Sequence, residues 1–451
     1  SFTLSLHPQV GITAMSLHTM SFVDAEYTTH HVHTFCGSLK SGVSDADLTF
    51  SAPSALLTLS DGSLLVADDS SQYLRVCAAD GSSVTTIVPK KATTGLVNVG
   101  PGGLLLATLP VASGHRQAAA VLVCDCGHNR LRVLSATGDS LTTLSGTGRR
   151  GHNDGPAMQA SFNRPQGIAI SGDGTCIFIA DTGNHCVRML NMRTNRVSTV
   201  AGRPGRSGCL DGSIRHALFS HPSSVCVLGD GTLAVADTGN NLIRLITLPT
   251  ERDRSLSLSR STYDSDGSGV STLAGFRAGG SRDGSCKGEA GFMCPVQVEC
   301  GWVEGSLLVL DQGNGCIRMI DADHRSVSTL ATGLTSPGGM AVSGDSVFVS
   351  DKGVHNIKVV ARSGLPESFS TRPSLSLNAS ASRPLTMSPA SSGRVRDVMQ
   401  QGEGERERGV VQGGRPILHS VPVSMAMPVS MSASMPARHM QDMRGAEAEA
   451  E

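Results

Sequence analysis

Aromatic residues are scarce in this sequence: Phe, Tyr and Trp together make up 3% of its 451 residues. Platforms that stack RNA bases and cages that enclose cationic ligands are built from aromatic rings. An excess of positive charge is also missing, since the formal net charge is −1. A dedicated nucleic-acid-binding domain needs clustered Lys and Arg. These two shortages disfavour nucleic acid as the main partner, although the composition leaves RNA binding open as an alternative.

Long hydrophobic runs and paired metal-binding cysteines are missing as well. No stretch reaches the roughly 20 uninterrupted apolar residues of a membrane-spanning helix, so we expect no membrane association. The twelve cysteines include no Cys-x-x-Cys pair, which argues against a zinc module. Cys124, Cys186 and Cys316 occupy positions where other repeats carry Ala or Leu. We therefore expect reduced, structural cysteines and a cytoplasmic location, with a signal in front of Ser1 left open.

What the sequence does contain is a repeat. An acidic residue is followed seven residues later by a base in six places: Asp68/Arg75, Asp125/Arg132, Asp181/Arg188, Asp237/Arg244, Asp311/Arg318 and Asp351/Lys358. Self-similarity at a period of tens of residues is typical of repeat architectures. The repeat therefore defines the fold before any site is considered.

The fullest copy predicts four short strands, at 167–170, 176–180, 186–190 and 197–202. Each run is apolar, rich in β-branched residues and bounded by Gly, Asp or Asn, which is the pattern of a β-strand. A four-stranded meander repeated every 40 to 55 residues or so is one blade of a β-propeller. The fold class is therefore all-β, and we expect a propeller over residues 1–361.

Blades are counted from a second landmark, the proline that opens the first strand 14 to 16 residues before the acidic residue. Together the two landmarks predict seven copies, near 8–37, 53–88, 97–146, 165–202, 222–275, 295–333 and 337–360. The first copy is degraded and lacks the base. We predict seven blades, with six as the alternative if the first copy only donates strands that close the ring.

Two stretches lie outside the repeat. Residues 362–451 are rich in Ser, Pro, Met and Gly, and we expect a disordered tail. Residues 250–269 form a Ser- and Arg-rich insert between the third and fourth strands of one copy, which we interpret as a surface loop.

The segments Asp181–Arg188 and Asp237–Arg244, with the sequences DTGNHCVR and DTGNNLIR, resemble the NHL-repeat family. The connecting segments that end at Pro222 and Pro295 resemble it too. This resemblance implies a propeller of four-stranded blades. It leaves activity open, because NHL propellers include protein-binding platforms, RNA-binding domains, extracellular sensors and a few lyases or lactonases.

An enzyme of the lyase or lactonase kind would hold a metal in the central channel. The starts of the inner strands offer Gly167, Ser223, Ser224 and Gln297, which are small or neutral. His128, His185 and His355 occupy turns that we expect away from the axis. We therefore predict no catalytic residue, no metal ligand and no cofactor, and keep a channel-site lyase or lactonase as the alternative. Calcium held by backbone carbonyls is left open, because it needs no signature side chain.

The repeated Asp/Arg pair is interpreted as a structural brace, since a buried Arg needs a carboxylate. Glycine-rich connectors between blades carry a second, less regular set of bases. We predict that these bases bind an anionic partner: Arg149, Arg150, Arg203, Arg206, Arg277 and Arg282. Each connector also carries an Asp that could neutralise them. The predicted function is a non-catalytic, monomeric binding scaffold, with protein as the favoured partner.

Overall fold

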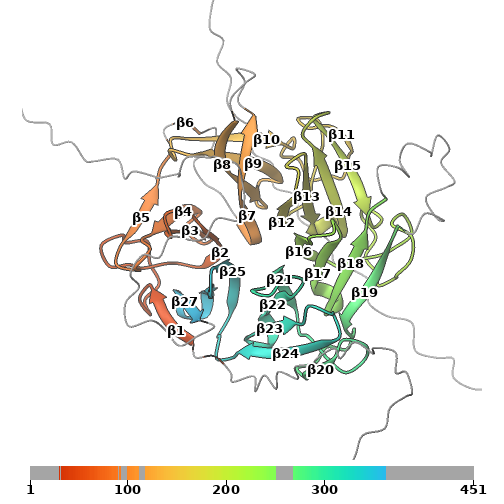
Figure 1. The fold of residues 1–451 in the computed structure, drawn as a ribbon. Coiled ribbons are helices and arrows are strands. Elements are labelled where there is room, and N and C mark those ends of the chain that lie inside the picture. Colours follow the sequence, from red (N-terminus) through yellow and green to blue (C-terminus); the bar gives the residue numbers. More distant parts are fainter. Residues whose placement is uncertain are drawn as a thin grey trace, which may run out of the picture. The chain divides into compact units, whose positions relative to one another are not determined.

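A computed structural model describes residues 30, 32–89, 91–92, 99–110, 117–249 and 268–361. These residues form six β-sheets arranged around a central axis (Figure 1). Each sheet contains four antiparallel strands, of which the one nearest the axis opens the blade, and blade 2 adds an outer strand that pairs in parallel. The prediction of an all-β propeller is confirmed.

The first three blades have the following strands. Blade 1 contains β2 (Pro53–Thr58), β3 (Leu64–Asp68), β4 (Tyr73–Cys77) and β5 (Val84–Ile87). Blade 2 contains β7 (Val99–Pro110), β8 (Gln117–Asp125), β9 (Arg130–Ser135), β10 (Ser140–Ser145) and the outer β6 (Lys91–Ala92). Blade 3 contains β12 (Pro165–Ile170), β13 (Cys176–Asp181), β14 (Cys186–Asn191), β15 (Arg196–Ala201) and the outer β11 (Gly155–Pro156).

The second half repeats this plan. Blade 4 contains β16 (Pro222–Val227), β17 (Leu233–Asp237), β18 (Leu242–Thr247) and β19 (Gly269–Gly275). Blade 5 contains β21 (Pro295–Cys300), β22 (Leu307–Asp311), β23 (Cys316–Ile320), β24 (Ser326–Ala331) and the outer β20 (Gly284–Ser285). Blade 6 contains β25 (Pro337–Ser343), β26 (Ser346–Asp351), β27 (Asn356–Ala361) and β1 (Val32–Cys36).

The described residues form six blades, so the preferred count of seven is wrong and the alternative of six is correct. The reason is β1, which pairs antiparallel with β27 and becomes the outermost strand of blade 6. The described part of the degraded first copy, residues 32–36, thus contributes a strand to the last blade. This pairing closes the ring by hydrogen bonds between the two ends of the propeller.

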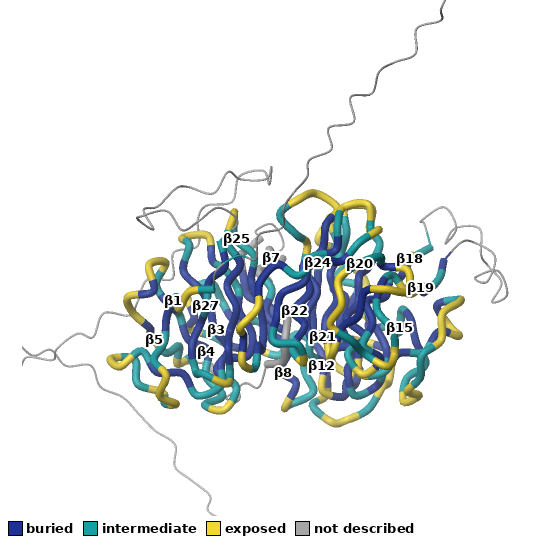
Figure 2. The backbone as a smooth tube through the Cα atoms, turned by 90° about the horizontal axis from the view of Figure 1, so that it is seen from below, coloured by how far each residue is buried: buried dark blue, intermediate teal, exposed yellow. Residues whose placement is uncertain are grey.

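The core lies between blades rather than within one. Six apolar clusters occur, each built from two neighbouring blades. Every residue of the second strands β3, β17 and β22 is buried, because both faces of these strands are covered. Figure 2 shows the consequence: buried strands run through the middle, and exposed residues gather in the turns above and below.

The turn after each second strand has a shared local structure. In blades 3 to 6 it is a short 3-10 helix: η1 (Thr182–Asn184), η2 (Thr238–Asn240), η4 (Gln312–Asn314) and η5 (Lys352–Val354). The residue after each helix has a left-handed backbone, with φ between 56° and 60°. Gly and Asn adopt this conformation most readily, and Gly315 and Asn241 occupy two of these positions. His185 and His355 occupy the other two.

Hydrogen bonds place these turns and the connectors on one rim of the propeller. Asn184 Nδ2 donates to the carbonyl of Gly151, and Asn240 Nδ2 donates to that of Gly208, at 2.7 and 2.8 Å. Gly151 and Gly208 belong to connectors. We call this side the connector rim. The turns between first and second strands and between third and fourth strands lie on the opposite rim, because each strand reverses the direction of the chain.

Besides residues 8–29 of the predicted first copy, two further predicted features lie outside the described residues. The whole of the predicted tail, residues 362–451, is one of them. The other is most of the Ser- and Arg-rich insert, residues 250–267, after which β19 begins at Gly269. Among the residues that the structure does describe, no helix is both long and apolar enough to cross a membrane.

Candidate binding surface

The six predicted arginines lie on the connector rim, in the three connectors that follow blades 2, 3 and 4. We call them the connector arginines. Five are exposed, and Arg203 is half-buried because its Nε donates to the carbonyl of Arg215 at 3.3 Å. Within the described part of the chain, none of the six takes part in a salt bridge. Their charges are therefore available to a partner.

The acidic residue of each connector is directed elsewhere. Asp154 Oδ1 accepts from Arg188 Nη2 at 2.7 Å, and its two oxygens also accept from the backbone and hydroxyl of Thr199. Asp211 and Asp283 do the same for the next two blades, at 2.5 and 2.7 Å from their arginines. These carboxylates therefore do not form salt bridges with the connector arginines. They complete the brace of the following blade.

The brace itself is buried and nearly identical from blade to blade. Arg188 is fully buried, and its Nη1 lies 2.8 Å from Asp181 Oδ2. The ring of Phe162 lies beside the guanidinium, 5.4 Å from it. The same Asp, Asp, Phe and Arg recur in blades 1, 4 and 5: Asp68/Asp45/Phe50/Arg75, Asp237/Asp211/Phe219/Arg244 and Asp311/Asp283/Phe292/Arg318.

Hydrogen bonds to the buried charged groups offset most of the free-energy cost of removing them from water. Asp181 accepts from Asn184 Nδ2 at 2.7 Å and from the backbone of Asn163 at 2.8 Å. Burial raises the pKa of Asp181 to about 6, and Arg188 with these donors limits the rise. The carboxylate and the guanidinium both stay charged at pH 7. The brace holds a connector, a turn and a third strand together.

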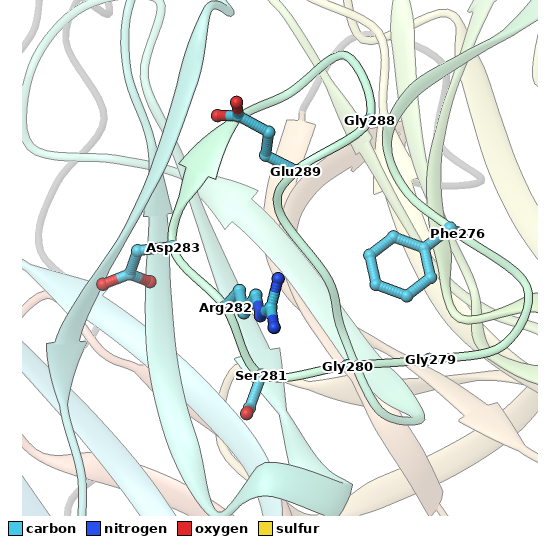
Figure 3. A pocket seen from close by; sticks show the side chains of 8 residues that line it. All are labelled: Phe276, Gly279, Gly280, Ser281, Arg282, Asp283, Gly288 and Glu289. Carbon is cyan, nitrogen blue, oxygen red and sulfur yellow. The ribbon is translucent and has the colours of Figure 1, made fainter.

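A hollow of about 580 Å³ opens in the connector that follows blade 4. Phe276 and Arg282 come from its two sides and point toward one another across it (Figure 3). Gly279 and Gly280 form its floor without side chains. Glu289 also lines it, and its carboxylate accepts from the backbone of Ser285 at 2.9 Å. The hollow thus offers one aromatic ring, the guanidinium of Arg282 and the carboxylate of Glu289.

Two bases on this rim were missed by the sequence reasoning. Arg164 is exposed immediately before Pro165, which opens β12. Arg130 begins β9, and its Nη2 donates to the carbonyl of Thr147 at 3.4 Å, beside Arg149. The position before the landmark proline was a signal that could have found Arg164, since that proline opens the first strand in five of the six described blades.

The three histidines of the turns do not converge. His128 Nδ1 lies 2.8 Å from Asp125 Oδ1, His355 Nδ1 lies 2.8 Å from the carbonyl of Ser51, and His185 packs edge-on against His221. Each makes contacts of its own. Across the described residues, no group of three or more His, Cys, Asp or Glu has a geometry that could hold a metal ion.

The inner strands use their polar residues to join blades. Ser223 Oγ donates to the carbonyl of Val296, and Gln297 Nε2 donates to that of Met340, at 2.7 and 2.9 Å. Further along the inner strands the channel becomes apolar, with a hollow of about 300 Å³. Glu299 lines this hollow. Burial raises the pKa of Glu299 to about 7, and a hydrogen bond from Gln297 limits the rise.

In the described residues, the fold and the repeated turn define a β-propeller of six blades, three with four strands and three with five. The family model described as NHL repeat matches residues 162–189 and 219–244, which include the turns and braces of blades 3 and 4. These two segments are therefore NHL repeats, as their resemblance indicated.

Relatives match over short segments. The protein SUPPRESSOR OF QUENCHING 1, chloroplastic, from Arabidopsis thaliana is 39% identical over 98 residues, which cover 22% of this chain and 9% of that protein. NHL repeat-containing protein 2 from Gallus gallus is 39% identical over 82 residues, covering 18% of this chain and 11% of that protein. The match thus spans about a tenth of the length of either relative.

Among solved structures, a structural genomics protein of unknown function from Bacteroides thetaiotaomicron superposes with a TM-score of 0.52 at 16% identity. The alignment covers 73% of this chain and 75% of that one. At this identity the likeness supports the fold alone.

Proposed function

We propose that this propeller is a non-catalytic scaffold that binds an acidic protein partner on its connector rim. One observation carries the proposal. Within the described residues the connector arginines form no salt bridge, because the acidic residues of the same loops, Asp154, Asp211 and Asp283, bind the brace instead. Guanidinium groups are thus presented on this rim without a salt bridge to the acidic residue of their own loop.

The chemistry of the rim fits carboxylates. Exposed guanidinium groups bind them with two parallel hydrogen bonds, and the neighbouring glycines allow a partner to approach the backbone closely. Each connector is held by the buried Arg of the following blade, so little conformational entropy is lost when a partner docks. Phe276 adds an apolar contact beside Arg282, in the hollow of Figure 3. An aromatic residue next to an Arg is a common centre of binding energy.

The proposal includes a monomeric protein in the cytoplasm that needs no metal or cofactor. All twelve cysteines are free thiols in this structure, and eight of them are buried. Free thiols persist where the cellular environment is reducing.

The test compares one variant with a matched control. Replacing all six connector arginines by Ala should abolish binding of a fluorescent polyglutamate peptide, measured by anisotropy, while the melting temperature stays nearly unchanged. The control replaces three exposed arginines on the opposite rim, Arg193, Arg196 and Arg325, and should bind the peptide as the parent protein does. Equal binding by both variants would contradict the proposal.

A second arm separates protein from RNA. The same two variants are titrated with a single-stranded RNA oligonucleotide at several salt concentrations. Tighter binding of RNA than of polyglutamate, with an affinity that falls steeply as salt rises, would replace the acidic protein by RNA as the partner. Turnover of a lactone that is lost on chelation would support the enzyme alternative instead.

A further inference from the structure

Two cysteines from neighbouring blades meet in the central channel. Cys226 lies near the end of β16 in blade 4, and Cys300 is the last residue of β21 in blade 5. Their Sγ atoms are 3.2 Å apart. Both thiols also lie near the carbonyl oxygen of Val227, at 3.9 and 3.6 Å. The two sulfur atoms are therefore in direct contact although 74 residues separate them in the chain.

The two thiols of the pair differ in their exposure to solvent. Cys300 is exposed, whereas Cys226 is 6% exposed and lies behind it. The apolar hollow of the channel, about 300 Å³, is lined by both cysteines. A second hollow of about 550 Å³, near Ser171 and Leu228 at the opposite rim, also reaches Cys300. A small reactant can thus reach Cys300 first.

The contact between the two thiols shifts their pKa values in opposite directions. The hydrogen bond from Cys226 lowers the pKa of Cys300, while burial and the nearby Glu299 act against it. The same hydrogen bond and burial raise the pKa of Cys226. The thiolate is the reactive form of cysteine, so Cys300 is the one that attacks an oxidant. Cys226 keeps its proton until a neighbouring sulfur becomes electrophilic.

We propose that Cys226 and Cys300 form a peroxide-sensitive dithiol that closes to a disulfide between blades 4 and 5. The oxidant is a hydroperoxide such as hydrogen peroxide. The Cys300 sulfur attacks one peroxide oxygen, the O–O bond breaks, and the leaving hydroxide takes up the thiol proton to form water, which leaves a sulfenic acid on Cys300. The Cys226 sulfur then attacks the Cys300 sulfur, its proton and the hydroxyl group leave as water, and the S–S bond forms. Both sulfurs are oxidised, and one peroxide is reduced to two waters.

The fold favours the second step. A disulfide has an S–S length of about 2.05 Å, so the sulfurs must approach by roughly 1 Å from their contact distance. They already lie on adjacent inner strands, and β16 and β21 pack against each other along the channel. The bond would join two blades that are otherwise held by hydrogen bonds and apolar packing. This inference is independent of the connector rim, because the pair lies in the channel.

A second cysteine pair in the structure supplies an internal comparison. Cys36 of β1 and Cys77 of β4 also form a side-chain hydrogen bond. Both are buried, at 3% and 0% exposure, in the cluster between blades 6 and 1. No hollow described for this protein is lined by them. We therefore expect peroxide to oxidise the channel pair well before this sealed pair.

The experiment uses the full chain and hydrogen peroxide. The protein is oxidised, the remaining thiols are alkylated, and peptides are analysed by mass spectrometry without reduction. The expected product is one cross-linked peptide pair that contains Cys226 and Cys300, lighter by two hydrogen atoms than its reduced parts and separated again by dithiothreitol. The oxidised protein should also melt roughly 2–5 °C higher than the reduced one.

Three variants sharpen the result. In Cys226→Ser, we expect peroxide to oxidise Cys300 further to a sulfinic acid, because no second thiol can form the disulfide. In Cys300→Ser, we expect Cys226 to stay reduced. Neither should show the rise in melting temperature. Cys294→Ser removes an exposed cysteine outside the channel and should form the disulfide as the parent does. Oxidation of Cys294 in the parent protein shows that peroxide has reacted. If Cys226 and Cys300 are then still found as separately alkylated thiols, the proposal is wrong. This outcome is measured on the parent protein and needs no variant to fold.

Discussion

Arginine has two opposite roles in blade 3 and its following connector. Arg188 is fully buried between two carboxylates, while Arg206, a few residues beyond the end of β15, is exposed and has no acidic partner in the described residues. The difference arises from the carboxylates. The connector Asp lies next to the connector arginines in the chain, but the fold aims it at the brace. Proximity in sequence is thus a poor guide to which charges neutralise each other.

Breaking the brace should have the largest effect. We expect Arg188→Ala to lower the free energy of unfolding by about 3–5 kcal/mol, because Asp181 would remain buried without its base. Urea denaturation of the variant and the parent measures this difference. Arg193→Ala, on an exposed turn of the same blade, is the control and should change stability by less than about 0.5 kcal/mol. Equal stability of the two variants would show that the buried pair is not a brace.

Neutralising one connector carboxylate tests how the brace arginines and the connector arginines influence each other. Asp211→Asn should cost about 1–2 kcal/mol, because Arg244 keeps its bond to Asp237 and Asp211 is 48% exposed. It should also strengthen binding of the polyglutamate peptide, since the rim becomes more positive. Asp230→Asn makes the same charge change on the opposite rim and serves as the control. Weaker peptide binding by Asp211→Asn would argue that the brace positions the connector more than it competes for charge.

The smallest effect concerns Glu299, a carboxylate in the channel. Unlike the brace aspartates, it forms no salt bridge with a base in the described residues. Its pKa is raised by burial from 4.5 to about 7. The native carboxyl therefore holds its proton at a pH where the unfolded chain has released it, and its contribution to stability is lost as pH rises through about 7. The melting temperature of the parent should fall relative to Glu299→Gln between pH 5 and pH 8 or so. Glu304→Gln, an exposed neighbour, should follow the parent across this range.

Much of the fold could be predicted from the residues. The Asp181 to Arg188 motif predicted strands on both sides of a turn, and β13 and β14 follow it. The blade count could not be predicted with certainty, because a strand such as β1 carries no mark of the sheet that it will join. Its partner, β27, lies more than three hundred residues away.

The candidate site was only partly predictable. The positions of the connector arginines on one rim followed from strand order. Their freedom from the connector carboxylates did not, because it depends on where Asp154, Asp211 and Asp283 point. The contact between Cys226 and Cys300 was also beyond sequence reasoning, which treated the cysteines as small core residues.

By itself, the sequence determined the repeat, the all-β class, the buried Asp/Arg pairs and the rim to which the connectors belong. These properties are local, since they depend on residues within one blade and on the alternation of strand direction. Tertiary structure alone decided the number of blades, the partners of the connector carboxylates and the meeting of two thiols in the channel. Each of these depends on contacts between residues more than thirty positions apart in the chain, which local strand and turn patterns do not specify.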